Sequence, residues 1–173
     1  MARHEQSVGR SDEWFTPEYV FDALESWFDL DVASPGKAIT PWIPAARCLT
    51  KEDNGLTAEW GDNFVWMNPP FGERNGLIPW LEKFFNHQNG IALVPDRTST
   101  PWWQEYVSKA DLVLFVSPKI KFIDVFGRIG RSPAQGTCLL SLGRTGSNAL
   151  QRAYQKGLGV LFSPEKVWGY YDN

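Results

Sequence analysis

Several features that often define a protein's class are scarce in this chain. It has two cysteines, Cys48 and Cys138, and two histidines, and their positions match no metal-ligand spacing and no disulfide framework. We therefore expect reduced cysteines and no bound metal. No apolar run approaches the roughly 20 residues of a membrane span, and the N-terminus lacks a signal-peptide core. These absences predict a cytoplasmic protein with no membrane partner.

Net charge is also low, at −3, which by itself is unusual for a protein that binds nucleic acid. The distribution of charge is uneven, however. Residues 1–96 carry 7 Lys/Arg against 15 Asp/Glu, whereas residues 97–156 carry 9 against 3. A concentrated basic segment is typical of a surface that contacts a phosphate backbone. The alternative, that these charges only solvate scattered surfaces, stays open.

Apolar residues are abundant, at 43% of the 173 residues, and charged residues make up 21%, which indicates a globular chain of about one domain. Residues 1–11 are polar without hydrophobic periodicity, and we predict that they are disordered and precede a domain over residues 12–173. Alternating strand and helix patterns predict an α/β fold with helices on both faces of one sheet. The interval between Asp31 and Asn68 is too short for two further strand–helix units, so we expect a reduced sheet.

Hydrophobic periodicity and breaker residues locate the expected elements. A helix capped by Thr16 should start at Pro17 and present Val20, Phe21, Leu24, Trp27 and Phe28 on one face. Strands are predicted at 28–33, 64–67, 91–94, 112–116, 137–142 and 160–162. Further helices should contain residues 77–85, 100–107 and 149–156. Residues 35–60 should be an irregular connection, and the glycine- and arginine-rich residues 127–136 a mobile loop.

The most informative stretch joins a predicted strand to the residues Asn68-Pro69-Pro70-Phe71. Two prolines end the strand and hold the preceding residues extended, so a polar side chain is fixed at a strand tip, where open α/β sheets bind ligands. The Asn68 side-chain oxygen and the Pro69 carbonyl could accept both hydrogens of a planar exocyclic amine, such as N6 of adenine. Phe71 could stack on the base, worth roughly 1–3 kcal/mol.

This stretch resembles the (D/N/S)PP(Y/F/W) motif of methyltransferases that act on amino groups of adenine or cytosine in DNA. The wider series is similar to the phage-type DNA N-6-adenine methyltransferase family. That series comprises Asp12-Glu13-Trp14-Phe15-Thr16-Pro17, Leu30-Asp31-Val32-Ala33, Thr50–Leu56, the NPPF residues, and Arg97-Thr98-Ser99-Thr100 with Trp103. The resemblance covers about residues 12–142. It implies an enzyme with a Rossmann-like sheet, which uses S-adenosylmethionine (SAM) as its methyl donor.

The resemblance also implies which residues contact the cofactor. The segment Phe15-Thr16-Pro17 would cover the methionine end of SAM, the strand end at Asp31 and Ala33 would be the first SAM motif, and Asp53 would lie near the adenosine. Asn68 would face both ligands. The strand end departs from the usual D-x-F-x-G-x-G pattern because it lacks the two central glycines. A simple helix start at residues 15–17 and a solvated loop aspartate at residue 53 are the alternatives.

The implied reaction is direct displacement of the methyl group by N6 of an adenine flipped out of the duplex. Candidates for DNA contacts are Arg97, Lys119, Lys121, Arg128 and Arg131, with the glycine–arginine loop as the segment that reads sequence. Three alternatives stay open at this point: methylation of cytosine N4, methylation of a protein glutamine, and a nonenzymatic DNA-binding protein on a degenerate methyltransferase fold. The sequence leaves the target site and the oligomeric state undetermined.

Overall fold

The computed structural model describes residues 14–70 and 76–164. Its strands are β1 (Phe28–Asp31), β2 (Ala45–Cys48), β3 (Val65–Met67), β4 (Gly90–Pro95), β5 (Leu112–Val116), β6 (Thr137–Leu142) and β7 (Gly159–Phe162). Its helices are α1 (Glu18–Leu24), α2 (Ile78–His87), α3 (Pro101–Tyr106) and α4 (Arg144–Gln155), and a 3-10 turn, η1 (Val107–Lys109), follows α3.

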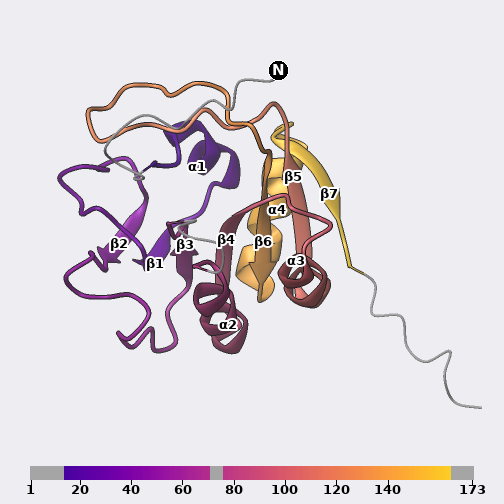
Figure 1. Cartoon of the computed structure of the whole chain (residues 1–173), viewed down its shortest axis with the longest axis horizontal. Helices are drawn as coiled ribbons and strands as arrows, with labels where there is room; N and C mark the ends of the chain where they lie inside the picture. The colour runs from indigo at the N-terminus through magenta and orange to yellow at the C-terminus, as the bar shows by residue number, and fades with distance from the viewer. Residues whose placement is uncertain (1–13, 71–75, 165–173) are drawn as a thin grey trace, which may run out of the picture.

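Within the described residues the strands form one seven-stranded sheet in the order β2-β1-β3-β4-β6-β5-β7. Strands β2, β1, β3 and β4 are parallel, β6 is antiparallel to its neighbours β4 and β5, and β7 is antiparallel to β5. Strands β1 to β5 therefore all end at one edge of the sheet, which is uppermost in Figure 1. We call this edge the carboxyl-terminal edge.

The sheet is covered on both faces, which explains why its central strands are apolar without alternation. In β4, Ile91 and Leu93 belong to the core cluster of α1 and α4, while Ala92 and Val94 belong to the cluster of α2 and α3. The strand is buried along its whole length. This arrangement confirms the predicted fold class, an α/β domain with helices on both faces of a Rossmann-like sheet.

Most of the predicted elements are also confirmed. Strands β5 and β6 have the predicted bounds, and β4 is longer than predicted by one residue at each end. The predicted apolar stripe of α2, which includes Trp80, Leu81 and Phe84, is buried against the sheet. Mostly apolar runs flanked by turn residues gave the strand predictions, because burial on both faces leaves few polar positions in such strands.

The first helix differs from the prediction at both ends. Pro17 is its N-cap residue and no side chain caps it, so the expected Thr16 cap is wrong. The helix ends at Leu24, and Glu25 takes a left-handed conformation at φ 46°. Trp27 consequently lies outside the helix with 64% of its surface exposed, and Phe28 belongs to β1. The chain must turn sharply here to enter the sheet, which overrides the helical spacing.

Two other elements were missed or shortened by the sequence analysis. Strand β2 has the sequence Ala-Ala-Arg-Cys, without the β-branched or aromatic residues that indicate strands, yet it pairs in parallel with β1 as an edge strand. Helix α4 begins at Arg144, five residues before the predicted start. Its first turn is polar, so hydrophobic periodicity did not reveal it. No described helix lies between β1 and β3, but β2 lies within residues 35–60, which were expected to be irregular throughout, and the sheet has seven strands, more than a reduced sheet would suggest.

None of the described helices has the length and apolar character needed to span a bilayer.

Candidate active site

The strand order reverses between β1 and β3, and this reversal brings two predicted site residues together. From β1 the chain continues to β2 on one side, and from β3 it continues to β4 on the other. Asp31 at the end of β1 is in register with Trp66 of β3, and Asn68 follows β3 directly. In open α/β sheets this crevice beyond the carboxyl ends of the strands is the ligand-binding position.

The side chain of Asn68 is held by the segment that precedes α1. Its Nδ2 donates to Thr16 Oγ1 at 3.2 Å and to the Trp14 carbonyl at 3.4 Å. A backbone carbonyl can only accept a hydrogen bond, so this contact fixes which end of the amide faces Trp14. Asn68 therefore directs its side-chain oxygen away from these partners and retains it as an acceptor.

Thr16 connects three segments that are distant in sequence. It is fully buried, its hydroxyl contacts Asn68, and its carbonyl accepts the indole N–H of Trp42 at 2.9 Å. Phe15 and Pro17 beside it are also buried. The Phe15-Thr16-Pro17 segment thus packs between the β1–β2 connection and the end of β3, and its role in covering the cofactor stays a prediction.

Asp31 is a buried carboxylate, only 3% exposed. Its Oδ1 accepts the Ala33 N–H at 3.3 Å, and no described lysine or arginine forms an ion pair with it. Burial raises the pKa of Asp31 to about 6, and the Ala33 N–H, the Ser34 hydroxyl and the Lys37 charge oppose this shift only in part. A buried carboxylate without an ion-pair partner suits a cationic ligand such as the sulfonium or ammonium group of SAM.

Asp53 lies on the turn after β2 and is exposed. Its Oδ2 accepts hydrogen bonds at 2.8 Å from the backbone N–H and the hydroxyl of Thr50, and these bonds lower its pKa. The turn is anchored to the sheet by Gly55, where a Cβ would lie 2.0 Å from the Val32 carbonyl oxygen. The 50–56 turn therefore lies against the end of β1, and the hydrogen bonds of Asp53 in the described structure go to Thr50.

The two prolines of the motif lie in different surroundings. Pro69 is buried and Pro70 is exposed, so the chain turns towards the surface immediately after Asn68. Phe71, the predicted stacking residue, lies outside the described residues.

The predicted DNA contacts lie on loops of the same edge. Arg97, after β4, donates to the Gln135 side chain at 2.8 Å, and Lys119, after β5, donates to the Ala134 carbonyl at 2.9 Å. Lys121, Arg128 and Arg131 are exposed in the connection from β5 to β6. Figure 1 shows this connection passing over the carboxyl-terminal edge above α1. The five cations therefore all lie on connections that leave the sheet at, or return to, its carboxyl-terminal edge.

Part of that connection is an ordered hairpin, residues 122–130, in which Ile123 pairs with Ile129. Ile123 also pairs with Phe15, through hydrogen bonds of 2.8 and 2.9 Å in the two directions. A Cβ on Gly130 would lie 2.5 Å from the Trp14 ring, so the indole lies directly on this glycine. The 122–130 hairpin is thus bonded to the segment that orients Asn68. Whether residues 127–136 are mobile stays a prediction.

Sequence reasoning missed the residues that support the site. The Trp14 carbonyl accepts a hydrogen bond from the Asn68 amide, and the Trp42 indole donates to the Thr16 carbonyl. The Asp124–Gly127 turn shapes the hairpin. The Asp-x-x-Gly spacing of residues 124–127 is a recognisable turn signal that could have indicated a hairpin. Nothing in the sequence indicates that Trp42 reaches Thr16, because that contact depends on how the β1–β2 connection folds back. Among the described residues, no cluster of three metal-ligating side chains occurs.

The fold and the candidate site together define a Rossmann-like α/β protein with polar groups at the switch point of its sheet. The profile of the DNA N-6-adenine-methyltransferase (Dam) family matches residues 4–140, and the chain belongs to this family. It is similar to the DNA N-6-adenine-methyltransferase of Haemophilus phage HP1 (strain HP1c1), with 25% identity over 130 residues that cover 72% of this chain and 73% of the phage protein. No solved structure matches.

Family membership decides between the readings that the sequence left open. The chain is an adenine-specific DNA methyltransferase, so DNA is its substrate and SAM is the methyl donor that such enzymes use in general. This confirms the adenine reading and removes the cytosine, glutamine and nonenzymatic alternatives. The family match does not assign roles to individual residues.

Proposed function

We propose that methyl transfer takes place beyond the ends of β1 and β3, where Asn68 and Pro69 accept hydrogen bonds from the amino group of a flipped adenine. The observation that carries this proposal is the orientation of Asn68. Because its amide nitrogen is committed to Thr16 and Trp14, its oxygen is available to accept a hydrogen from N6. The Pro69 carbonyl would accept the second hydrogen, since proline keeps its acceptor.

These two acceptors would favour the change of N6 from planar to tetrahedral geometry. The lone pair of N6 is delocalised into the ring and is released for bonding as the nitrogen pyramidalises. Acceptors fixed in advance stabilise the charge that develops on the amino group without further reorganisation. The amine can release its proton after the methyl group has arrived, so the site needs no strong base. Phe71, directly after the two prolines, would stack on the flipped base.

The cofactor position is supported by the charge and placement of Asp31 and the covering segment. Bound SAM supplies a methyl group on a positively charged sulfur. Asp31 would balance that charge or the ammonium group, Phe15, Thr16 and Pro17 would exclude water from the methionine end, and Ala33 would border the same strand end. The 50–56 turn supports a place for the adenosine beside the end of β1, with Asp53 as its polar group.

The basic loops support the way DNA would approach this site. Arg97, Lys119, Lys121, Arg128 and Arg131 project from connections at the carboxyl-terminal edge, beside the place proposed for the adenine. In this arrangement they would contact phosphates while the adenine leaves the helix, a step that requires a few kcal/mol.

Replacement of Asn68 tests the proposal directly. Asn68→Ala should remove most methyl transfer to unmodified DNA, measured as incorporation of labelled methyl groups, while SAM binding measured by calorimetry changes much less. Asn63→Ala is a matched control, because Asn63 is also partly buried and its amide donates to the Trp60 carbonyl away from the site. Wild-type turnover in Asn68→Ala would refute the assignment.

A further inference from the structure

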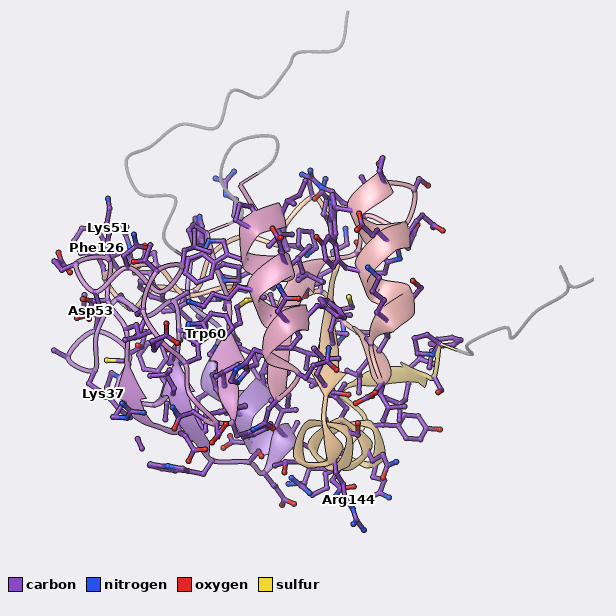
Figure 2. The ribbon with its side chains drawn as sticks, turned by 90° about the horizontal axis from the view of Figure 1, so that it is seen from below. Lys37, Lys51, Asp53, Trp60, Phe126 and Arg144 are labelled. Atoms are coloured by element: carbon purple, nitrogen blue, oxygen red, sulfur yellow. The ribbon has the colours of Figure 1, made fainter. Side chains whose placement is uncertain are left out.

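Two large apolar side chains, Phe126 and Ile129, are exposed on the 122–130 hairpin, and we call them together its apolar end. Phe126 is 77% exposed and Ile129 is 73% exposed, the two highest values among the large hydrophobic residues in the described part of the chain. Figure 2 shows Phe126 at the margin of the molecule. Neither residue contributes to the core, and exposed apolar groups beside a functional site commonly mark a contact surface.

The end of the hairpin is a well-formed turn. The Gly127 N–H donates to the Asp124 carbonyl at 3.0 Å, and Asp124 Oδ1 accepts the backbone N–H groups of Phe126 and Arg128, both at 2.9 Å. Gly127 takes φ +77°, a conformation that favours glycine. Phe126 is therefore held in position before any partner arrives, which lowers the entropy lost on binding.

The hairpin is bonded to the catalytic segment. Ile129 pairs with Ile123, Ile123 pairs with Phe15, and the residues on either side of Phe15 bond to the Asn68 amide. The apolar end therefore keeps a fixed relation to the position proposed for the flipped adenine. It could act on the same short stretch of DNA that supplies this base.

The chain on either side of Phe126 and Ile129 is rich in cations. Residues 117–136 contain four Lys/Arg and one acidic residue, Asp124. The guanidinium of Arg128 bonds to Asp124 at 2.8 Å and lies 4.9 Å from the centre of the Phe126 ring. An apolar ring beside an arginine, within a basic stretch of chain, complements DNA, in which stacked bases lie between two rows of phosphates.

We propose that Phe126, supported by Ile129, inserts between base pairs of the duplex next to the flipped adenine. Removal of a base from the stack leaves a gap and an unstacked neighbour, and an apolar wedge can fill that gap and slow the return of the base. Arg128 would hold the adjacent phosphate. This role rests on base flipping as described under the proposed function, and it makes Phe126 a positioning residue that does not touch the reacting atoms.

The test measures DNA unwinding separately from methyl transfer. Wild-type protein and variants are bound to plasmid DNA free of N6-methyladenine, with S-adenosylhomocysteine present, and the plasmid is relaxed by a topoisomerase. Insertion of a wedge unwinds the duplex and shifts the distribution of topoisomers. Phe126→Ala should lose most of this shift and should methylate native DNA more slowly by about tenfold or more, given the few kcal/mol needed to unstack a base step.

Matched variants separate the wedge from a general loss of apolar surface. Phe126→Trp keeps a ring and should retain both unwinding and activity, while Ile129→Ala should show a smaller loss than Phe126→Ala. Trp27→Ala is the control, because Trp27 is 64% exposed, lies near the Lys37 ammonium and precedes β1 at the opposite edge of the sheet. It should change neither measurement.

Several results would overturn the wedge. One is unwinding by Phe126→Ala equal to that of the wild type, and another is a wild-type protein that methylates DNA without unwinding it. A third is a dimer in sedimentation that dissociates in Phe126→Ala while DNA unwinding is unchanged, which would assign the apolar end to self-association. Failure of the Asn68 proposal looks different, because Asn68→Ala would then methylate DNA at the wild-type rate whatever the result for Phe126.

Discussion

The amide nitrogen of Asn68 lies 3.2 Å from the hydroxyl oxygen of Thr16, and this bond joins the end of β3 to the segment before α1. Thr16 is fully buried, so water is not available to replace it as a partner. The bond therefore has an orienting function, because it determines which end of the Asn68 amide faces the substrate. It also makes Thr16 a testable part of the site.

Thr16→Val should slow methyl transfer while leaving the fold intact. Valine has nearly the shape of threonine but offers no acceptor, so Asn68 would lose a partner worth about 1–3 kcal/mol and reorient in part. We expect a fall in kcat of about tenfold, in line with the rate change for such an energy. Thr16→Ser keeps the hydroxyl and should stay close to the wild type. Equal turnover in the valine and serine variants would contradict an orienting role.

The pKa of Asp31 predicts how cofactor affinity depends on pH. In the folded protein this pKa is raised from 3.8 to about 6 by burial. A cationic ligand binds the charged carboxylate, so SAM affinity should increase as pH rises through about 6 and level off above it. Calorimetric titrations at pH 5, 6 and 7.5 would measure this. Asp31→Asn should bind more weakly and lose the pH dependence, whereas an unchanged profile would exclude Asp31 from the cofactor site.

The same shift predicts an effect on stability, with a definite sign. Between pH 4 and 6 the folded state holds a proton on Asp31 that the unfolded state has lost, so this group makes the protein less stable as pH rises. Above pH 6 the penalty is complete and amounts to about 3 kcal/mol for a shift of this size. Asp31→Asn should therefore raise the free energy of unfolding at pH 7.5 and change it little at pH 4. Denaturant titrations of both proteins at the two pH values measure this, and a stabilisation by Asp31→Asn that is larger at pH 4 than at pH 7.5 would contradict the prediction.

The sequence predicted most of the sheet because burial on both faces leaves a clear signature. Strands such as Leu112–Val116 are apolar runs between turn residues, and the pair of prolines after Asn68 marks the end of a strand. Asp31 and Asn68 were each predicted at the end of a strand, and the register shows that these two strands are neighbours. The family and the adenine specificity were predicted from motifs that occur in a fixed order along the chain, and the family match confirms both predictions.

The contacts between distant segments could not be predicted from the sequence. Trp42 bonds to Thr16, and Ile123 pairs with Phe15, although the partners are far apart in the sequence and lie outside the helices and strands. Such contacts depend on the path of irregular loops, which periodicity does not encode. Strand β2 was missed because an edge strand with exposed positions has no need of apolar residues. The roles of the predicted site residues remain predictions.

Gly55 should be required for stability because of its close approach to the sheet. A Cβ there would lie 2.0 Å from the Val32 carbonyl oxygen and 2.9 Å from the Trp80 ring, so the backbone itself would have to move. We expect Gly55→Ala to destabilise the protein by about 3 kcal/mol or more, at the upper end for overpacking. The measurement is the free energy of unfolding from denaturant titration.

Gly157→Ala provides the comparison for Gly55→Ala. Gly157 has φ +80° and nothing within 4 Å of a Cβ, so its substitution adds only backbone strain of roughly 1–2 kcal/mol. The contact at Gly55 also holds the 50–56 turn against β1, so Gly55→Ala should weaken SAM binding as well. Equal destabilisation in the two variants would show that the close approach at Gly55 is of no consequence.

The salt dependence of DNA binding should report on the two arginines of the β5–β6 connection. Arg128 and Arg131 are exposed beside the proposed position of the DNA, and each phosphate contact contributes about 0.9 to the slope of log K against log salt. Arg128→Ala combined with Arg131→Ala should therefore reduce that slope by roughly 1–2.

Lys109→Ala with Arg144→Ala is the control pair, because it removes the same charge from η1 and the start of α4, at the opposite edge of the sheet. Figure 2 shows Arg144 on a different side of the molecule from Phe126. The control pair should leave the slope unchanged, because those cations would lie away from the duplex. If both pairs reduce the slope equally, the cations act only through net charge, and the β5–β6 connection does not contact the phosphates.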